Sequence, residues 1–206
     1  MKKLVMLMIA LMPLYAWAQD NTWERPEEEE TEVAKVKVNP DAKYLKGAVP
    51  EVDGKIVFAK TIEAPGKTAA EVYDIVKKYM EKMTREKNQV SSRIAVEDSV
   101  QWLLGATFDE WLVFKSTFIS LDRTRFLYML KAVCHDGSAD ISISRINYIY
   151  GEGRDEHRYR AEEWISDKAA VNKKNTKLLP ISGKFRRKTI DRKDYLFNKF
   201  TKALAQ

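Results

Sequence analysis

The chain has 206 residues, of which 45% are hydrophobic and 32% are charged, with only 8 glycines. This composition predicts a folded domain with a sizeable core, and it excludes fibrous, wholly disordered and solenoid-repeat proteins. One cysteine excludes a disulfide framework and a cysteine-clustered zinc site, and two histidines leave little material for another metal centre. The net charge of +6 is unevenly spread, because residues 168–202 hold twelve basic and two acidic residues.

The first eighteen residues have the pattern of a signal peptide. Lys2 and Lys3 precede an apolar run over residues 4–15, and Ala-Trp-Ala at 16–18 is a small-x-small cleavage pattern. The apolar run is shorter than the roughly 20 residues that a membrane-spanning helix needs, and a retained anchor is the alternative. We therefore expect a signal peptide at 1–18, export to the periplasm or the cell exterior, and no transmembrane anchor after cleavage.

The next segment, residues 19–49, differs from the rest of the chain in charge and pattern. Residues 20–32 hold seven acidic residues and one basic residue, and the stretch up to Gly54 shows prolines but no helical or strand period. Such a segment has little apolar surface to bury. We predict an acidic, proline-containing arm or linker over 19–49 and a single α+β domain over 50–206.

The domain is expected to open with a strand and a helix. Residues 55–62 are rich in β-branched side chains, and Ile56, Phe58 and Ile62 share one side of that strand. Thr68 and Glu71 form a capping-box pattern that predicts a helix from Thr68 to about Arg85. Its apolar side chains recur at helical spacing and predict a core-facing stripe: Val72, Ile75, Val76, Tyr79, Met80 and Met83.

Consecutive strands are predicted over the middle of the chain. They cover residues 93–97, a longer strand containing 111–114 and extending toward Ile119, residues 125–134 and residues 139–150. The last two flank an Asp-Gly hairpin turn at 135–138. Within 139–150 the apolar positions change from odd to even, so we expect a one-residue β-bulge near Ser144-Arg145 that returns them to one face.

The C-terminal part is predicted to be mainly helical. A polar loop is expected over 152–160, a short helix over 162–170, another loop ending at Gly183, and a long helix from Phe185 or Thr189 to Leu204. The final helix carries an apolar face at 3–4 spacing. The elements thus predict an α+β fold: a strand, a helix, about four antiparallel strands and a long C-terminal helix.

Four sequence segments carry a family resemblance. They are Gly54–Gly66, Ser120–Arg123, Ala161–Ile165 and Gly183–Asp191. Over about residues 50–205 the chain resembles a family of uncharacterised exported proteins of Bacteroides-type bacteria, a domain of unknown function with a TATA-binding-protein-like fold. The resemblance implies a curved antiparallel sheet with helices packed against it. It brings no catalytic residues, and a shared fold does not imply DNA binding.

No pattern in the chain predicts an enzyme, a cofactor or a metal site. There is no glycine-rich phosphate loop, nucleophile elbow or paired-histidine zinc motif. Cys134 and His135 are neighbours on a strand and would point to opposite faces, and the adjacent carboxylates Asp109 and Glu110 would do the same. We expect Cys134 to be a buried, inert core residue. We infer a non-enzymatic protein.

A basic cluster at the start of the C-terminal helix is the candidate site: Lys184, Arg186, Arg187 and Lys188. Cations are disfavoured at a helix N-terminus, so these side chains form either a solvated face or an anion or partner site. A third hypothesis is that the acidic arm, through Glu27–Glu30, binds to these basic side chains. Nucleic acid is disfavoured because the predicted signal peptide exports the chain.

Two functional hypotheses follow. The first is a binding module of the cell envelope that contacts a protein, a glycan or an anionic surface. The alternative is a carrier that holds a small apolar ligand between the sheet and the C-terminal helix. A carrier needs a cavity on the order of 300–1,000 Å³. Large side chains available to fill that space argue against it: Trp102, Trp111, Phe114, Phe126, Phe197 and Phe200.

Overall fold

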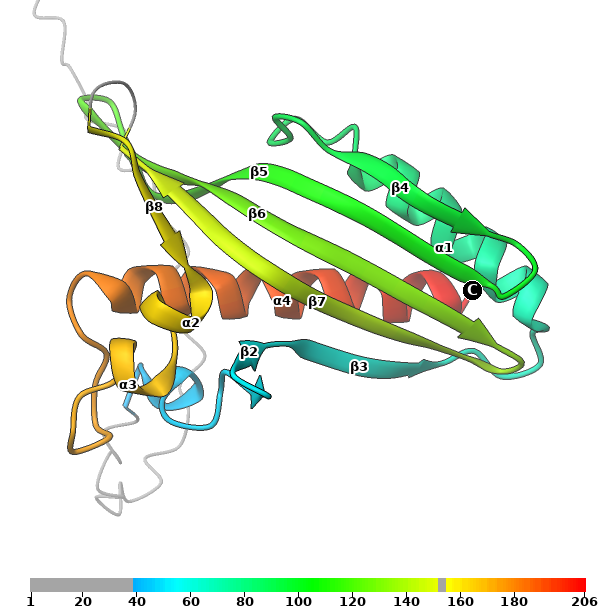
Figure 1. Cartoon of the computed structure of the whole chain (residues 1–206), viewed down its shortest axis with the longest axis horizontal. Helices are drawn as coiled ribbons and strands as arrows, with labels where there is room; N and C mark the ends of the chain where they lie inside the picture. Colours follow the sequence, from blue (N-terminus) through cyan, green and yellow to red (C-terminus); the bar gives the residue numbers. More distant parts are fainter. Residues whose placement is uncertain (1–38, 152–154) are drawn as a thin grey trace, which may run out of the picture. The chain divides into compact units, whose positions relative to one another are not determined.

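An antiparallel sheet of six strands organises the structure, a computed structural model that describes residues 39–151 and 155–206. The strand order is β3-β7-β6-β5-β4, and β8 pairs with the C-terminal part of β7 (Figure 1). The strands are β1 (Glu51–Val52), β2 (Lys55–Ile56), β3 (Phe58–Glu63), β4 (Arg93–Asp98), β5 (Leu103–Thr117), β6 (Ser120–His135), β7 (Ser138–Tyr150) and β8 (His157–Arg160). The helices are η1 (Ala42–Tyr44), α1 (Ala69–Met83), α2 (Ala161–Trp164), α3 (Asp167–Ala170) and α4 (Ser182–Leu204).

The two long helices lie on the same side of the sheet. Figure 1 shows α1 and α4 behind the strands, where α1 packs on β6 and α4 crosses β3 and β5. The core lies between these layers, since alternate side chains of each strand point toward the helices. On β6 the buried apolar side chains are Phe126, Tyr128, Leu130, Ala132 and Cys134. The predicted α+β fold with an antiparallel sheet is confirmed.

The predicted bulge in β7 is confirmed. Leu127 pairs with Asn147, whereas Met129 pairs with Ser144, so β7 has one extra residue between these pairs. Arg145 occupies it in the left-handed region, with φ at 53°. The extra residue brings the apolar side chains on both sides of it to the core face, including Ile143 and Ile146.

Two local motifs set the geometry at the ends of α1 and β6. Thr68 Oγ1 accepts from the Glu71 amide at 3.3 Å, and a Glu71 carboxylate oxygen accepts from the Thr68 amide at 2.8 Å, so the capping box is confirmed. Asp136 and Gly137 form the turn between β6 and β7, with φ of 75° at Gly137. Both motifs satisfy strong local preferences, which is why the sequence pattern located them.

The region after β7 differs from the prediction. Residues 157–160, expected within a polar loop, form β8, because backbone pairing with β7 needs no apolar alternation. The expected helix over 162–170 is interrupted at Ile165 and forms α2 and α3. Gly183 does not end a loop: it lies in the first turn of α4, where its position leaves only 2.6 Å between an added Cβ and Leu178 Cβ.

The start of the domain also differs from the prediction. Residues 39–49, expected to belong to an unpacked arm, are part of the same compact unit as the sheet. Tyr44 and Val49 are buried in its core, and the Tyr44 hydroxyl donates to Asp191 of α4 at 2.9 Å. The remaining arm and the predicted signal peptide lie outside the described residues. Within the described residues no helix is long and apolar enough to cross a membrane.

Candidate functional site

Arg186, a member of the predicted basic cluster, is completely buried. Its guanidinium donates to the backbone carbonyls of Tyr44, Leu45 and Ile165 at 2.6–2.7 Å and to the Asp167 carboxylate at 2.6 Å. Burial lowers the pKa of Arg186, and the hydrogen bond to Asp167 opposes that shift. Arg186 therefore joins α4 to the segments before β1 and after β8 and cannot contact a ligand.

The other three predicted cations point to different surroundings. Lys184 donates to Asp122 at 2.8 Å and to the Tyr150 hydroxyl at 2.9 Å, and its ammonium lies over the Phe114 and Tyr150 rings. Arg187 pairs with Asp41 at 2.5 Å. Lys188 is half-buried. The structure therefore does not gather four available cations into an anion site, because internal partners occupy three of them.

The side of the sheet opposite the two long helices is the larger accessible feature, and we call it the uncovered face. It is formed by the side chains of β3, β5, β6 and β7 that alternate with the core residues. Most are half-buried, which is the exposure expected for a sheet surface that no second layer covers within residues 39–151 and 155–206. Away from the ends of the sheet, the uncovered face consists of Ala59, Thr61, Leu103, Thr107, Asp109, Trp111, Arg125, Leu127, Met129, Lys131, Val133, Asp140, Ser142, Ser144, Asn147 and Ile149.

Arginines on this side of the sheet are engaged with neighbouring side chains. Arg125 donates from Nε to Asp109 at 2.7 Å and makes a second bond to the same carboxylate through a terminal nitrogen. These bonds raise the pKa of Arg125. The Arg123 guanidinium lies 3.7 Å from the centre of the Trp111 ring, a cation–π contact. Between these arginines and the β6–β7 turn, Leu127 and Met129 form a small apolar centre on β6, bordered by polar side chains of β5 and β7: Thr107, Asp109, Ser144 and Asn147.

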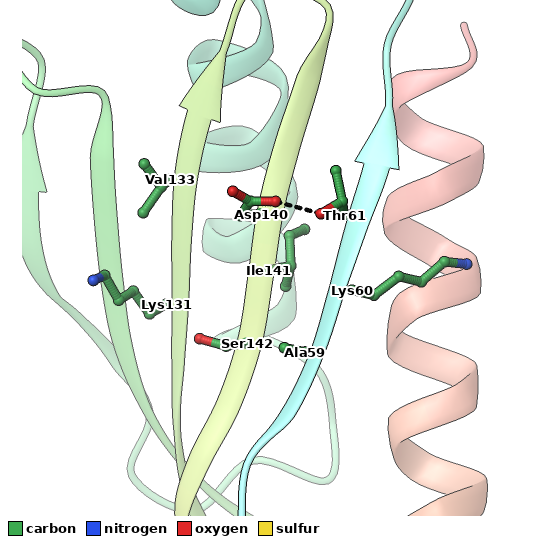
Figure 2. A pocket seen from close by; sticks show the side chains of 8 residues that line it. All are labelled: Ala59, Lys60, Thr61, Lys131, Val133, Asp140, Ile141 and Ser142. Carbon is green, nitrogen blue, oxygen red and sulfur yellow. Dashed lines mark hydrogen bonds between the residues drawn. The ribbon is translucent and has the colours of Figure 1, made fainter. Parts of the chain in front are cut away.

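A shallow groove of about 370 Å³ crosses the end of the uncovered face near the β6–β7 turn. Figure 2 shows Asp140 of β7 and Thr61 of β3 meeting across the two strands, with a hydrogen bond of 2.5 Å. That bond lowers the pKa of Asp140, and His135, 3.2 Å away, adds to the shift. Lys131 and Lys60 point away from each other on either side (Figure 2). The groove can hydrogen-bond a polar group, but it holds no nucleophile beside a base.

Cys134 and His135, neighbours in the sequence, lie in different surroundings. Cys134 is buried on the core face, and burial raises the pKa of its thiol to about 12, so the prediction of a buried cysteine is confirmed. His135 is exposed at the turn. In the described ranges, 39–151 and 155–206, no three His, Cys, Asp or Glu side chains are grouped to hold a metal.

Known proteins are similar to this chain in sequence and in fold. A family described as a domain of unknown function (DUF4468) with TBP-like fold matches residues 58–149. The crystal structure of a DUF4468 family protein from Bacteroides ovatus is 40% identical, with a TM-score of 0.75, over 81% of this chain and 95% of that chain. The chain belongs to the DUF4468 family.

A TBP-like protein from Parabacteroides distasonis has a similar fold. It is 19% identical, with a TM-score of 0.62, over 76% of this chain and 96% of that chain, and it supports the fold alone. No curated protein matches the chain. The family resemblance predicted from the sequence is thus confirmed, whereas export stays a prediction.

The uncovered face of this DUF4468 protein was not among the sequence predictions, although β6 carried a signal for it. Residues 126–130 are apolar without interruption. A half-solvated antiparallel strand usually alternates apolar and polar residues, so a continuous run indicates apolar side chains on both faces. The side chains that alternate with the core in this run are Leu127 and Met129, at the centre of the uncovered face.

The space between the sheet and α4 is filled by aromatic rings. The centre of the Phe185 ring lies 5.1 Å from that of Tyr148 and 4.6 Å from that of Phe114, and Phe126 is 5.7 Å from Tyr148. Phe185 is completely buried. This packing gives a ligand carrier no support in this DUF4468 domain, because its aromatic side chains occupy the place where an apolar ligand would lie.

Proposed function

We propose that this protein is a non-enzymatic interaction module and that the uncovered face of its sheet docks onto another protein. The observation that carries the proposal is the half-exposed apolar centre of that face, with Leu127 and Met129 side by side on β6. Accessible apolar side chains rimmed by polar residues are typical of interaction sites in soluble domains, and here the rim is formed by Thr107, Asp109 and Ser144. With the predicted signal peptide, the interaction would take place in the periplasm or outside the cell.

The composition of the uncovered face favours a protein partner. The cores of protein interfaces are enriched in aromatic residues, methionine and arginine and depleted in lysine and glutamate. Trp111, Met129 and Arg125 fit this pattern, and Lys131 is the single lysine in the set that defines the face. Nucleic acid binding needs several cations available for phosphates, whereas Arg125 is already paired with Asp109.

The dimensions of the uncovered face also suit a protein partner. Three strands with roughly ten residues each and β3 with six, about 4.8 Å apart and at about 3.3 Å per residue, form a platform of roughly 570 Å² before side-chain relief is added. A standard protein interface covers about 800 Å² on each partner. The face is therefore large enough to form most of one interface.

The test places a photo-crosslinking amino acid at Met129 and, as a matched control, at Val52, which is 57% exposed in β1. We expect crosslinks to one envelope protein from position 129 and none to that protein from position 52. Binding of the identified partner should be lost in Leu127→Glu/Met129→Glu and retained in Val52→Glu, all checked for folding by circular dichroism. Retention in the double variant would refute the proposal.

A further inference from the structure

The β5–β6 hairpin ends in two apolar side chains that contact almost nothing. Phe118 is 104% exposed and Ile119 is 89% exposed, and the nearby Leu121 is 55% exposed. We call Phe118 and Ile119 the hairpin tip. Exposed side chains of this size lower solubility unless they have a binding role.

The hairpin tip projects beyond the sheet. Among the described residues, β6 pairs with β7 only as far as Thr124, which faces Tyr150. From Val113 to Thr117, β5 is paired with β6 and continues past β4, as Figure 1 shows at the end of the hairpin. Phe114 still packs on Phe185, so the free ribbon runs from Lys115 to Thr117, three residues at about 3.3 Å each or roughly 10 Å. The tip is therefore held away from the body of the domain.

Turn chemistry does not account for these side chains. A two-residue hairpin turn favours glycine, asparagine or aspartate, because the preferred turn types need a positive φ. The Asp136–Gly137 turn at the other end of β6 follows that rule. Phe118 and Ile119 are not among the described residues with positive φ, and neither residue type favours a turn. Departures from local preference of this kind are expected at functional sites.

Cationic side chains flank the hairpin. Lys115 is exposed on β5, three residues before the tip, and Arg123, whose guanidinium stacks on the Trp111 ring, lies on β6 at the base of the ribbon. The carboxylate beside them, Asp122, is already bound to Lys184 at 2.8 Å. An apolar point with cations behind it complements a lipid surface, in which acyl chains lie beneath phosphate headgroups.

We propose that the hairpin tip inserts into the interface of a lipid bilayer, with Lys115 at the headgroup level. Two side chains expose roughly 400 Å², about half of what one partner contributes to a standard protein interface. A narrow convex tip also offers little shape for a rigid partner to match. A bilayer closes around the tip without a preformed pocket. This inference is independent of the protein-docking role proposed for the uncovered face.

The first test reports where position 118 lies. Phe118→Cys is labelled with an environment-sensitive fluorophore, which Cys134 does not take up because its thiol is buried. We expect a blue shift and higher emission on addition of vesicles of phosphatidylethanolamine and phosphatidylglycerol. The matched control is Val100→Cys, at an equally isolated apolar residue that is 86% exposed, and it should show no shift. Unchanged emission at position 118 would overturn the proposal.

The second test measures binding of the full chain to the same vesicles by flotation. Phe118→Ser/Ile119→Ser should reduce the partition coefficient by about tenfold or more, because two apolar side chains no longer leave water. Val100→Ser should bind like the wild type. Equal binding of the double variant would overturn the proposal. So would a concentration-dependent dimer, seen by sedimentation velocity, that the double variant loses, since the tip would then seat on a second copy.

Discussion

Arg192 of α4 donates two hydrogen bonds to the completely buried carboxylate of Glu110 on β5, at 2.8 and 2.7 Å. The same carboxylate accepts from the side-chain amides of Asn88 and Gln89 and from the Tyr128 hydroxyl. Burial lowers the pKa of Arg192, but the hydrogen bonds and charge of Glu110 outweigh burial and raise it above its usual value. This charged pair ties the C-terminal helix to the centre of the sheet.

Glu110→Gln should lower the free energy of unfolding by about 3 kcal/mol, because it leaves the Arg192 guanidinium buried with the Glu86 carboxylate, at 3.3 Å, as its remaining counter-charge. Urea unfolding followed by tryptophan fluorescence measures the loss. Replacing both members, in Glu110→Met/Arg192→Met, should cost less than the two single changes together. Glu97→Gln, in the exposed pair with Lys77, is the control and should change little. Equal effects at 97 and 110 would contradict a buried ion pair.

Arg186→Met should release the segment before β1 from the domain. The substitution leaves three buried carbonyls, those of Tyr44, Leu45 and Ile165, without a donor. Loss of the partners of buried groups costs about 1–3 kcal/mol each. We expect faster hydrogen exchange over residues 42–49, measured by mass spectrometry, and a lower free energy of unfolding.

The control for that experiment is Lys188→Met, two residues along α4, which removes a half-buried cation. It should leave exchange over residues 42–49 unchanged. If both variants behave alike, the buried guanidinium is not what holds the segment.

Local patterns predicted the sheet and its helices because strong short-range preferences agree there with the fold. The Thr68 capping box, the Asp136–Gly137 turn and the parity change around Arg145 each lie within a few residues of chain. Each pattern is satisfied by one local structure: a capped helix terminus, a tight turn and a β-bulge, respectively.

The candidate sites could not be predicted in the same way, because they depend on partners far apart in the chain. In the sequence Arg186 is one cation of a cluster of four, and its burial depends on carbonyls supplied by Tyr44 and Ile165. The adjacent carboxylates Asp109 and Glu110 do point to opposite faces, as expected from a strand, but their arginine partners come from β6 and α4. Pairing between distant segments leaves no periodic trace in the sequence.

Arg145→Gly should stabilise the protein by about 1 kcal/mol, because the left-handed backbone conformation is less favourable by roughly that amount for a non-glycine residue. Arg145 is exposed, with φ at 53°, so the change removes backbone strain without removing core contacts. Arg145→Val should have the opposite effect, since a β-branched side chain fits this conformation poorly. Thermal and urea unfolding of the two variants give the comparison. A destabilised glycine variant would show that the arginine side chain itself supports the bulge.

Cys134 should resist thiol reagents at pH 8 until the protein unfolds, because burial raises the pKa of its thiol from 9.0 to about 12. Labelling with a maleimide should therefore follow the unfolding equilibrium as urea is added, whereas the exposed thiol of Val100→Cys reacts at once.

The raised pKa of the Cys134 thiol also makes the free energy of unfolding depend on pH. The neutral buried thiol contributes its full stability below pH 9, and that contribution falls as the pH rises toward 12. The difference in unfolding free energy between the wild type and Cys134→Ala should shift in favour of the alanine variant over that range, and a pH-independent difference would contradict the shifted pKa.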